Sequence, residues 1–177
     1  GELIQQVLTA PEKAQWIVKA AMEDKDVQVQ KHLSKALKVI PEDWLALLMP
    51  LLDNPSYETV AIALEKLCEA HPDKAKQFLL LTQNTVGTRG RNVRIKWLEL
   101  SLIYQPDPKW AKELIGFTSN SFEFLSRVAA AEACWRLNLY SDVLMANLLE
   151  AAGSPNGRLR NPCRAVIRKF YQQPIIR

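Results

Sequence analysis

A proline followed by an acidic residue returns along this chain at nearly constant intervals, and this repeat limits the possible folds more than any other feature. Four copies, and a fifth with serine in place of proline, are Pro11-Glu12, Pro41-Glu42, Pro72-Asp73, Pro106-Asp107 and Ser141-Asp142. Their steps are 30, 31, 34 and 35 residues. Proline fits the first helical turn, where its missing N–H has no intrahelical partner, and an acid there meets the positive end of the helix dipole. Each copy therefore predicts a helix start.

A valine keeps the same rhythm, 12 or 13 residues before each later helix start. From each valine an apolar stripe runs at offsets of three, four and seven residues, which is one face of an α-helix. The stripes are Val29, Leu33, Ala36; Val60, Leu64, Leu67; Val93, Trp97, Leu100; and Val128, Ala131, Trp135. Short runs rich in Asp, Asn, Gly, Ser and Pro separate the two features. Each repeat therefore predicts a helix, a turn and a second helix.

A single helix pair cannot bury both of its faces, so neighbouring pairs must stack. The tetratricopeptide and ankyrin signatures are absent, whereas Asp53-Asn54-Pro55 and Asn92-Val93-Arg94 look like the turn and second-helix start of HEAT repeats. We predict an all-α fold, a HEAT/armadillo-like α-α superhelix of about five helix pairs in one domain over residues 1–177. The predicted pairs lie near residues 11–40, 41–71, 72–105, 106–140 and 141–172.

Residues that could carry catalysis or bind a metal show no recognised pattern. The two histidines, His32 and His71, belong to no HExxH motif, and no GxSxG, Walker or dinucleotide motif occurs. The three cysteines stand far apart without a CxxC pair, which predicts free, buried thiols. The five tryptophans fall within apolar stripes and are predicted to pack in the core, with a stacking platform as the alternative. We therefore predict no catalytic residue, no metal ligand and no cofactor in this chain.

The charge of the chain is uneven. Residues 1–72 hold 11 acidic and 7 basic residues, whereas residues 73–177 hold 8 acidic and 16 basic ones. In HEAT-type arrays the second helices line the concave side, so five arginines are predicted to face a common groove for an acidic or carboxylate-bearing partner. These candidate binding residues are Arg91, Arg94, Arg127, Arg164 and Arg168. A solvated basic face is the alternative. Gly87-Thr88-Arg89-Gly90 is a weak candidate for an anion-binding turn or a plain inter-helix turn.

Neither a signal peptide nor an apolar run of about 20 residues is visible, so we expect a cytoplasmic protein without a membrane span. The chain opens with Gly1 and not Met, which suggests a fragment. A periplasmic location is expected if the full-length parent carries a signal peptide.

The stretch Asn92-Val93-Arg94-Ile95-Lys96-Trp97-Leu98-Glu99-Leu100-Ser101-Leu102 is followed by Lys112-Glu113-Leu114-Ile115-Gly116-Phe117-Thr118-Ser119 and further helix pairs. Over residues 55–172 the chain resembles the C-terminal helical region of bacterial aminopeptidase N-like (gluzincin) zinc metallopeptidases. The resemblance implies a non-catalytic domain that walls or caps the cleft of a catalytic domain, with zinc held by that domain. The catalytic HExxH motif and its distant glutamate have no counterpart here.

Three functions follow from these observations. The first is a helical accessory domain of a zinc aminopeptidase, which has no activity on its own and whose partner is its upstream catalytic domain. The second is a free-standing HEAT-like scaffold that binds another protein or peptide. The third is a nucleic-acid-binding HEAT-like protein of the DNA alkylation-repair type, which the acidic first 72 residues disfavour.

Overall fold

A computed structural model describes residues 11–84 and 90–172. In this part of the chain every regular element is a helix and there is no strand, which confirms the all-α prediction. The residues form two compact units, Gly1–Val93 and Arg94–Arg177. The boundary falls within α7 (Arg91–Tyr104).

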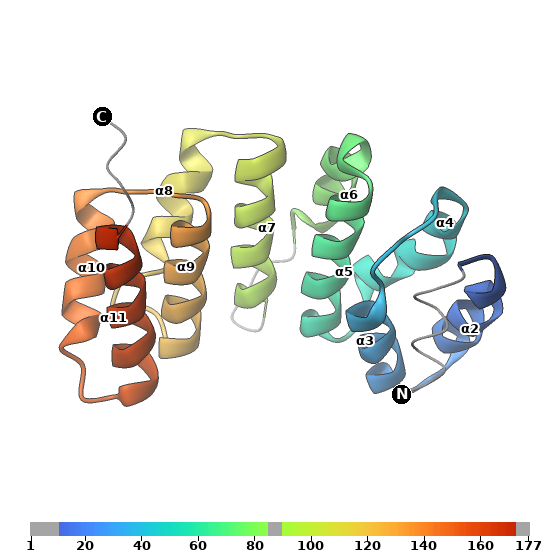
Figure 1. The fold of residues 1–177 in the computed structure, drawn as a ribbon, viewed down its shortest axis with the longest axis horizontal. Coiled ribbons are helices and arrows are strands. Elements are labelled where there is room, and N and C mark those ends of the chain that lie inside the picture. The colour runs from blue at the N-terminus through green and yellow to red at the C-terminus, as the bar shows by residue number, and fades with distance from the viewer. Residues whose placement is uncertain (1–10, 85–89, 173–177) are drawn as a thin grey trace. The chain divides into compact units, whose positions relative to one another are not determined.

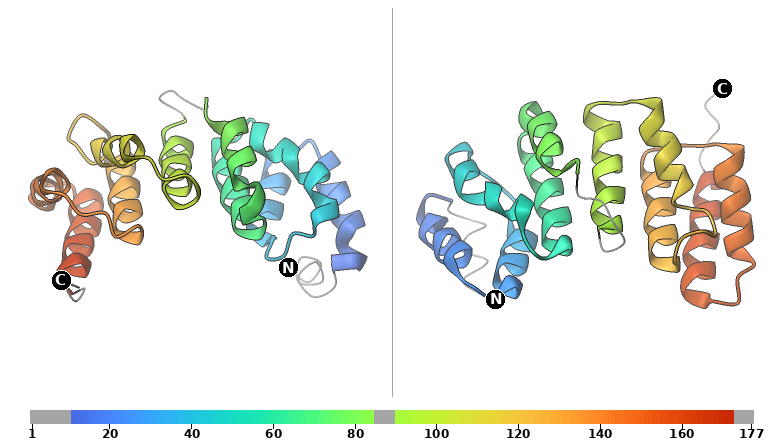
Figure 2. Two further views of the ribbon diagram at one scale, coloured as in Figure 1. Left: turned by 90° about the horizontal axis from the view of Figure 1, so that it is seen from above. Right: turned by 180° about the vertical axis from the view of Figure 1, so that it is seen from behind.

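The first unit contains two layers of helices (Figures 1 and 2). Its α-helices are α2 (Pro11–Glu23), α3 (Val27–Ala36), α4 (Leu45–Leu48), α5 (Tyr57–Ala70) and α6 (Ala75–Thr82). Three 3-10 helices accompany them: η1 (Glu42–Trp44), η2 (Met49–Asp53) and η3 (Pro72–Lys74). The second helices of the repeats, α3 and α5, pack on each other in one layer, and α2, the η1–α4–η2 segment and α6 form the other layer.

The second unit continues from α7 with two further helix pairs. They are α8 (Pro108–Gly116) with α9 (Phe124–Arg136), and α10 (Asp142–Ala152) with α11 (Gly157–Gln172). α11 packs on both α9 and α10. The front and top views agree that α9 and α11 lie in one layer and α8 and α10 in the other (Figures 1 and 2). The predicted alternation of first and second helices is therefore present within each unit.

The helix starts lie where the repeat predicts them. α2 begins at Pro11 and η3 begins at Pro72. At the later copies a side chain caps the helix: Asp107 accepts from the backbone N–H of Lys109 at 2.9 Å, and Ser141 accepts from that of Leu144 at 3.1 Å. Such caps satisfy N–H groups that have no partner inside the helix.

The first helix of the second repeat is broken into short pieces. α4 contains only four residues and is flanked by η1 and η2. Pro50 follows at the start of η2, and a proline here removes one backbone donor and clashes with the carbonyl four residues earlier. The regular α-helix expected after Pro41 is therefore replaced by a tighter, interrupted segment.

Most residues of the predicted stripes are part of the core, although Val29, Ala36, Val128 and Trp135 are only half-buried. Val60, Leu64, Leu67, Val93 and Leu100 are all buried. Trp44 and Trp97 are buried as well, and the three cysteines are free and buried, as predicted. The prediction is wrong for Trp16, whose exposed fraction is 65%.

None of the described helices is long and apolar enough to cross a bilayer. Of the possible anion-binding turn, residues 87–89 lie outside the described residues, and Gly90 directly precedes α7. The single domain over residues 1–177 and its superhelical arrangement stay predictions.

Candidate binding surface

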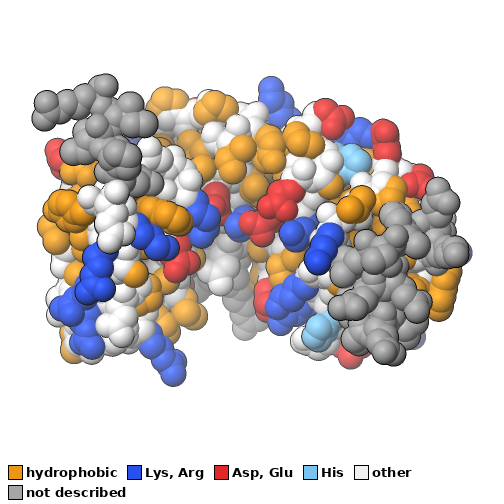
Figure 3. Space-filling view, viewed as in Figure 1, with side chains coloured by type: hydrophobic (Ala, Val, Ile, Leu, Met, Phe, Trp, Pro, Cys, Tyr) orange, Lys and Arg blue, Asp and Glu red, His pale blue; other side chains and the backbone are white. Residues whose placement is uncertain are grey.

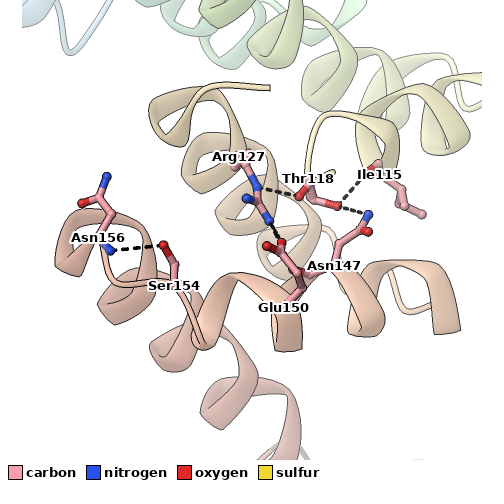
Figure 4. A network of polar contacts seen from close by, with 7 residues as sticks. All are labelled: Ile115, Thr118, Arg127, Asn147, Glu150, Ser154 and Asn156. Atoms are coloured by element: carbon pink, nitrogen blue, oxygen red, sulfur yellow. Dashed lines mark hydrogen bonds and ion pairs between the residues drawn. The ribbon is translucent and has the colours of Figure 1, made fainter. Parts of the chain in front are cut away.

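Arg127 lies in the first turn of α9 with an exposed fraction of 5%. Its Nε donates to the Thr118 carbonyl at 3.0 Å, and its Nη2 forms an ion pair with Glu150 (Figure 4). The Asn147 amide donates to the Thr118 hydroxyl at 2.9 Å, and this hydroxyl donates to the Ile115 carbonyl at 2.6 Å. Arg127 therefore joins the end of α8 to α9 and α10 inside the unit and is buried away from a partner.

Arg94 is engaged in a similar way between α7 and α8. Its Nε and Nη2 donate to the two carboxylate oxygens of Glu113 at 2.7 and 2.8 Å, the paired geometry that suits a guanidinium. The guanidinium carbon lies 4.4 Å from the ring centroid of Trp97 and 5.4 Å from that of Trp110. The two rings meet edge to face at 4.8 Å. Packing and charge pairing therefore fix Arg94 at the α7–α8 contact.

A third internal ion pair was missed by the sequence reasoning. Glu99 of α7 is 5% exposed, and it accepts from Arg136 of α9 through both carboxylate oxygens and pairs with Lys96 at 2.9 Å. Burial raises the pKa of Glu99, but hydrogen bonds from Arg136 and Lys96 outweigh it and lower the pKa below its ordinary value. A glutamate three residues after a lysine is typical of an ion pair on a helix surface, so no local signal indicates that the Glu99 carboxylate is buried.

The remaining predicted arginines fall in different places. Arg91 is half-buried at the first position of α7 and belongs to the first unit. Arg164 and Arg168 are exposed on α11, four residues apart. The structure thus brings Arg164 and Arg168 together on one helix face and commits Arg94 and Arg127 to internal contacts. The common groove of all five stays a prediction.

The positive charge of the second unit is concentrated on α11. Five basic residues outside this helix form ion pairs with four carboxylates, in the pairs Arg94–Glu113, Lys96–Glu99, Lys109–Asp107, Arg127–Glu150 and Arg136–Glu99. α11 itself carries Arg158, Arg160, Arg164, Arg168 and Lys169 and no acid. Blue side chains gather over α11 in the space-filling view (Figure 3). The candidate binding surface is therefore the solvent side of this helix.

The histidines and cysteines occupy structural positions. His71 Nε2 lies 2.8 Å from the Ile40 carbonyl, and His32 Nδ1 lies 2.6 Å from the Gln28 carbonyl. Within residues 11–84 and 90–172, no three His, Cys, Asp or Glu side chains cluster as metal ligands would.

No protein-family model, no curated protein and no solved structure matches the chain.

Proposed function

We propose that this chain is a non-catalytic helical domain of an aminopeptidase N-like zinc metallopeptidase. In this role it forms a HEAT-like repeat array that walls or caps the cleft of a separate catalytic domain, which holds the zinc. The resemblance of residues 92–102 and 112–119 supports the family. We place the protein in the cytoplasm.

One observation carries the non-catalytic part of the proposal. Three glutamates of the second unit that could do acid or base chemistry instead hold helices together. Glu99, Glu113 and Glu150 are each bound to an arginine of another helix. For Glu99 these hydrogen bonds also lower the pKa of the carboxyl group, which suits a structural role better than proton transfer.

The reading frame that encodes the chain tests this proposal directly. We expect it to continue upstream into an HExxH motif followed by a distant glutamate, the zinc site of the family. The full-length protein should cleave aminoacyl reporter substrates, and deletion of residues 92–172 should lower that activity while the zinc stays bound. A complete reading frame without the motif would overturn the proposal.

A free-standing scaffold is the second candidate, and the exposed basic face of α11 favours it. Such a protein would bind its partner without any catalytic domain in the same reading frame. Nucleic-acid binding is disfavoured, because five basic residues of the second unit already form ion pairs with carboxylates of the same unit. A protein that grips a duplex needs many free cations along the phosphates.

A further inference from the structure

Three arginines of α11 form one row on its solvent side. Arg160, Arg164 and Arg168 follow one another at four-residue spacing, so they lie above one another on the helix. Residues Leu159 and Cys163 face the core and are buried. At a rise of 1.5 Å per residue, the row extends about 12 Å along the helix. We call these three residues the α11 arginine row.

Two members of the row are held in place by the turn that precedes α11. Arg164 Nε donates to the Ala152 carbonyl at 3.0 Å. Arg160 Nη1 lies 3.3 Å from the Ser154 carbonyl and 3.4 Å from that of Pro155. A guanidinium has five N–H donors, so each of these contacts orients the group and leaves further donors for a partner. Ordering these side chains in advance reduces the entropy cost of binding.

We infer that the α11 arginine row docks an acidic segment of a partner protein, with carboxylates about one helical turn apart facing the guanidiniums. This inference rests on the second candidate function, a scaffold that binds a partner protein, and it names the chemistry of that partner. Charge complementarity carries it, since α11 has five cations and no acid. Arg168 is exposed, and no ion pair among the described residues holds it.

The short extent of the row favours protein carboxylates over a nucleic acid. The neighbouring cations of the unit, such as Arg94, Arg127 and Arg136, are already paired with glutamates. Most of the basic residues of the second unit that lie outside these pairs therefore follow about three turns of one helix, which suits a compact acidic segment. A nucleic acid would meet too few free cations to follow its backbone.

The test measures binding of a fluorescein-labelled oligo-glutamate peptide to the full chain by anisotropy at low salt. An oligo-lysine peptide and a single-stranded oligothymidine of equal length serve as comparison probes. The test variant is Arg164→Gln with Arg168→Gln. The matched control is Arg158→Gln with Lys169→Gln, which removes the same charge from the same helix outside the row. Circular dichroism melts report whether each variant is folded.

We expect the row variant to bind oligo-glutamate roughly tenfold more weakly and the control variant to differ by less than about twofold. Arg168→Gln alone, which removes no described hydrogen bond, should weaken binding severalfold if the double variant folds poorly. Equal losses in the row and control variants, or no oligo-glutamate binding by the wild type, would overturn the inference. Tighter binding of oligothymidine that the row variant abolishes would replace the protein partner with a nucleic acid. None of these results depends on whether an HExxH motif lies upstream. The proposed function and this inference can therefore fail independently of each other.

Discussion

Arginines of this chain serve two different purposes, and the difference lies in what each side chain can reach. Arg94 and Arg127 meet a glutamate 19 and 23 residues further along the chain and become part of the interior. Arg164 and Arg168 lie on a helix without acids and stay at the surface. The sequence pattern could select all four as basic residues of second helices. It could not assign their partners, because these depend on how separate helices pack.

The Arg127–Glu150 pair should contribute more stability than an ordinary surface pair. Glu150 and Glu58 are similarly exposed, at 53% and 54% of their side chains. Arg127, however, is 6% exposed, whereas Lys31 and Lys35, which both pair with Glu58, are 21% and 50% exposed. Removing Glu150 leaves a buried guanidinium without its counter-charge. We expect Glu150→Ala to lower the free energy of unfolding by about 2–3 kcal/mol. Glu58→Ala should cost less than about 1 kcal/mol. Urea denaturation measures both, and equal effects would contradict the structural role of Arg127.

Glu99 should make the stability of the protein depend on acid. Its folded-state pKa is lowered, so the stabilisation is present above the ordinary value of 4.5 and is lost as the pH falls through the folded-state pKa. Glu99→Gln cannot lose this contribution on acidification. We therefore expect the variant to lose less stability than the wild type between about pH 6 and about pH 3. Urea midpoints across this range test it, and parallel curves for the two proteins would refute it.

The three cysteines should be chemically silent in the folded protein. Burial raises the pKa of Cys68 and of Cys134 to about 12 and also raises that of Cys163. The reactive thiolate is therefore scarce at neutral pH. We expect a thiol reagent such as DTNB to modify all three only in denaturant. Rapid labelling of any of them in buffer would contradict their burial.

At the scale of single helices, the sequence predicted the starts well and the interiors less well. Proline, serine and aspartate act on the backbone next to them, so their effect is readable from neighbouring residues. The interruption at Pro50 was missed because Leu45, Leu48 and Leu52 keep a helical spacing on either side of it. In the structure those leucines are buried although the backbone changes from α4 to η2.

The Ser141 cap offers a test at this scale. Its hydroxyl accepts from the Leu144 backbone N–H at 3.1 Å, and loss of such a cap leaves a helical donor without its side-chain partner. Ser141→Ala should lower the free energy of unfolding by about 1 kcal/mol. Ser121→Ala, in an exposed turn, should change it by less than about 0.5 kcal/mol. If Ser121→Ala destabilises as much as Ser141→Ala, the cap contributes nothing of its own.

For the whole molecule, the all-helical class followed from the repeat, because periodic apolar stripes describe each helix locally. The candidate binding surface could be predicted from the sequence only in part. Arg164 and Arg168 were selected, whereas Arg160 was not, although its four-residue spacing was readable. The internal use of Arg94 and Arg127 could not be predicted, since Glu113 and Glu150 lie on other helices.

The proposed role predicts a chain that has no peptidase activity by itself. The isolated protein should retain less than stoichiometric zinc after dialysis and should leave aminoacyl reporter substrates intact. Three of its glutamates, Glu99, Glu113 and Glu150, are held in ion pairs with arginines of other helices and are thus engaged in the fold. Mass spectrometry measures the zinc content of the chain. A fluorogenic assay measures cleavage of the aminoacyl substrates, with a known zinc aminopeptidase as the positive control. One tightly bound zinc per chain with turnover would contradict the role.

The ion pairs that cross between helix pairs have a consequence for how such a chain could evolve. Glu99 of α7 depends on Arg136 of α9, and Arg127 of α9 depends on Glu150 of α10. The third, fourth and fifth repeats are therefore linked by charge pairs whose two halves belong to different repeats. Deleting the last repeat would leave the buried Arg127 guanidinium without its counter-charge, which is unfavourable. The repeats of the second unit are thus not interchangeable modules, and their number cannot drift freely even though their sequences look alike.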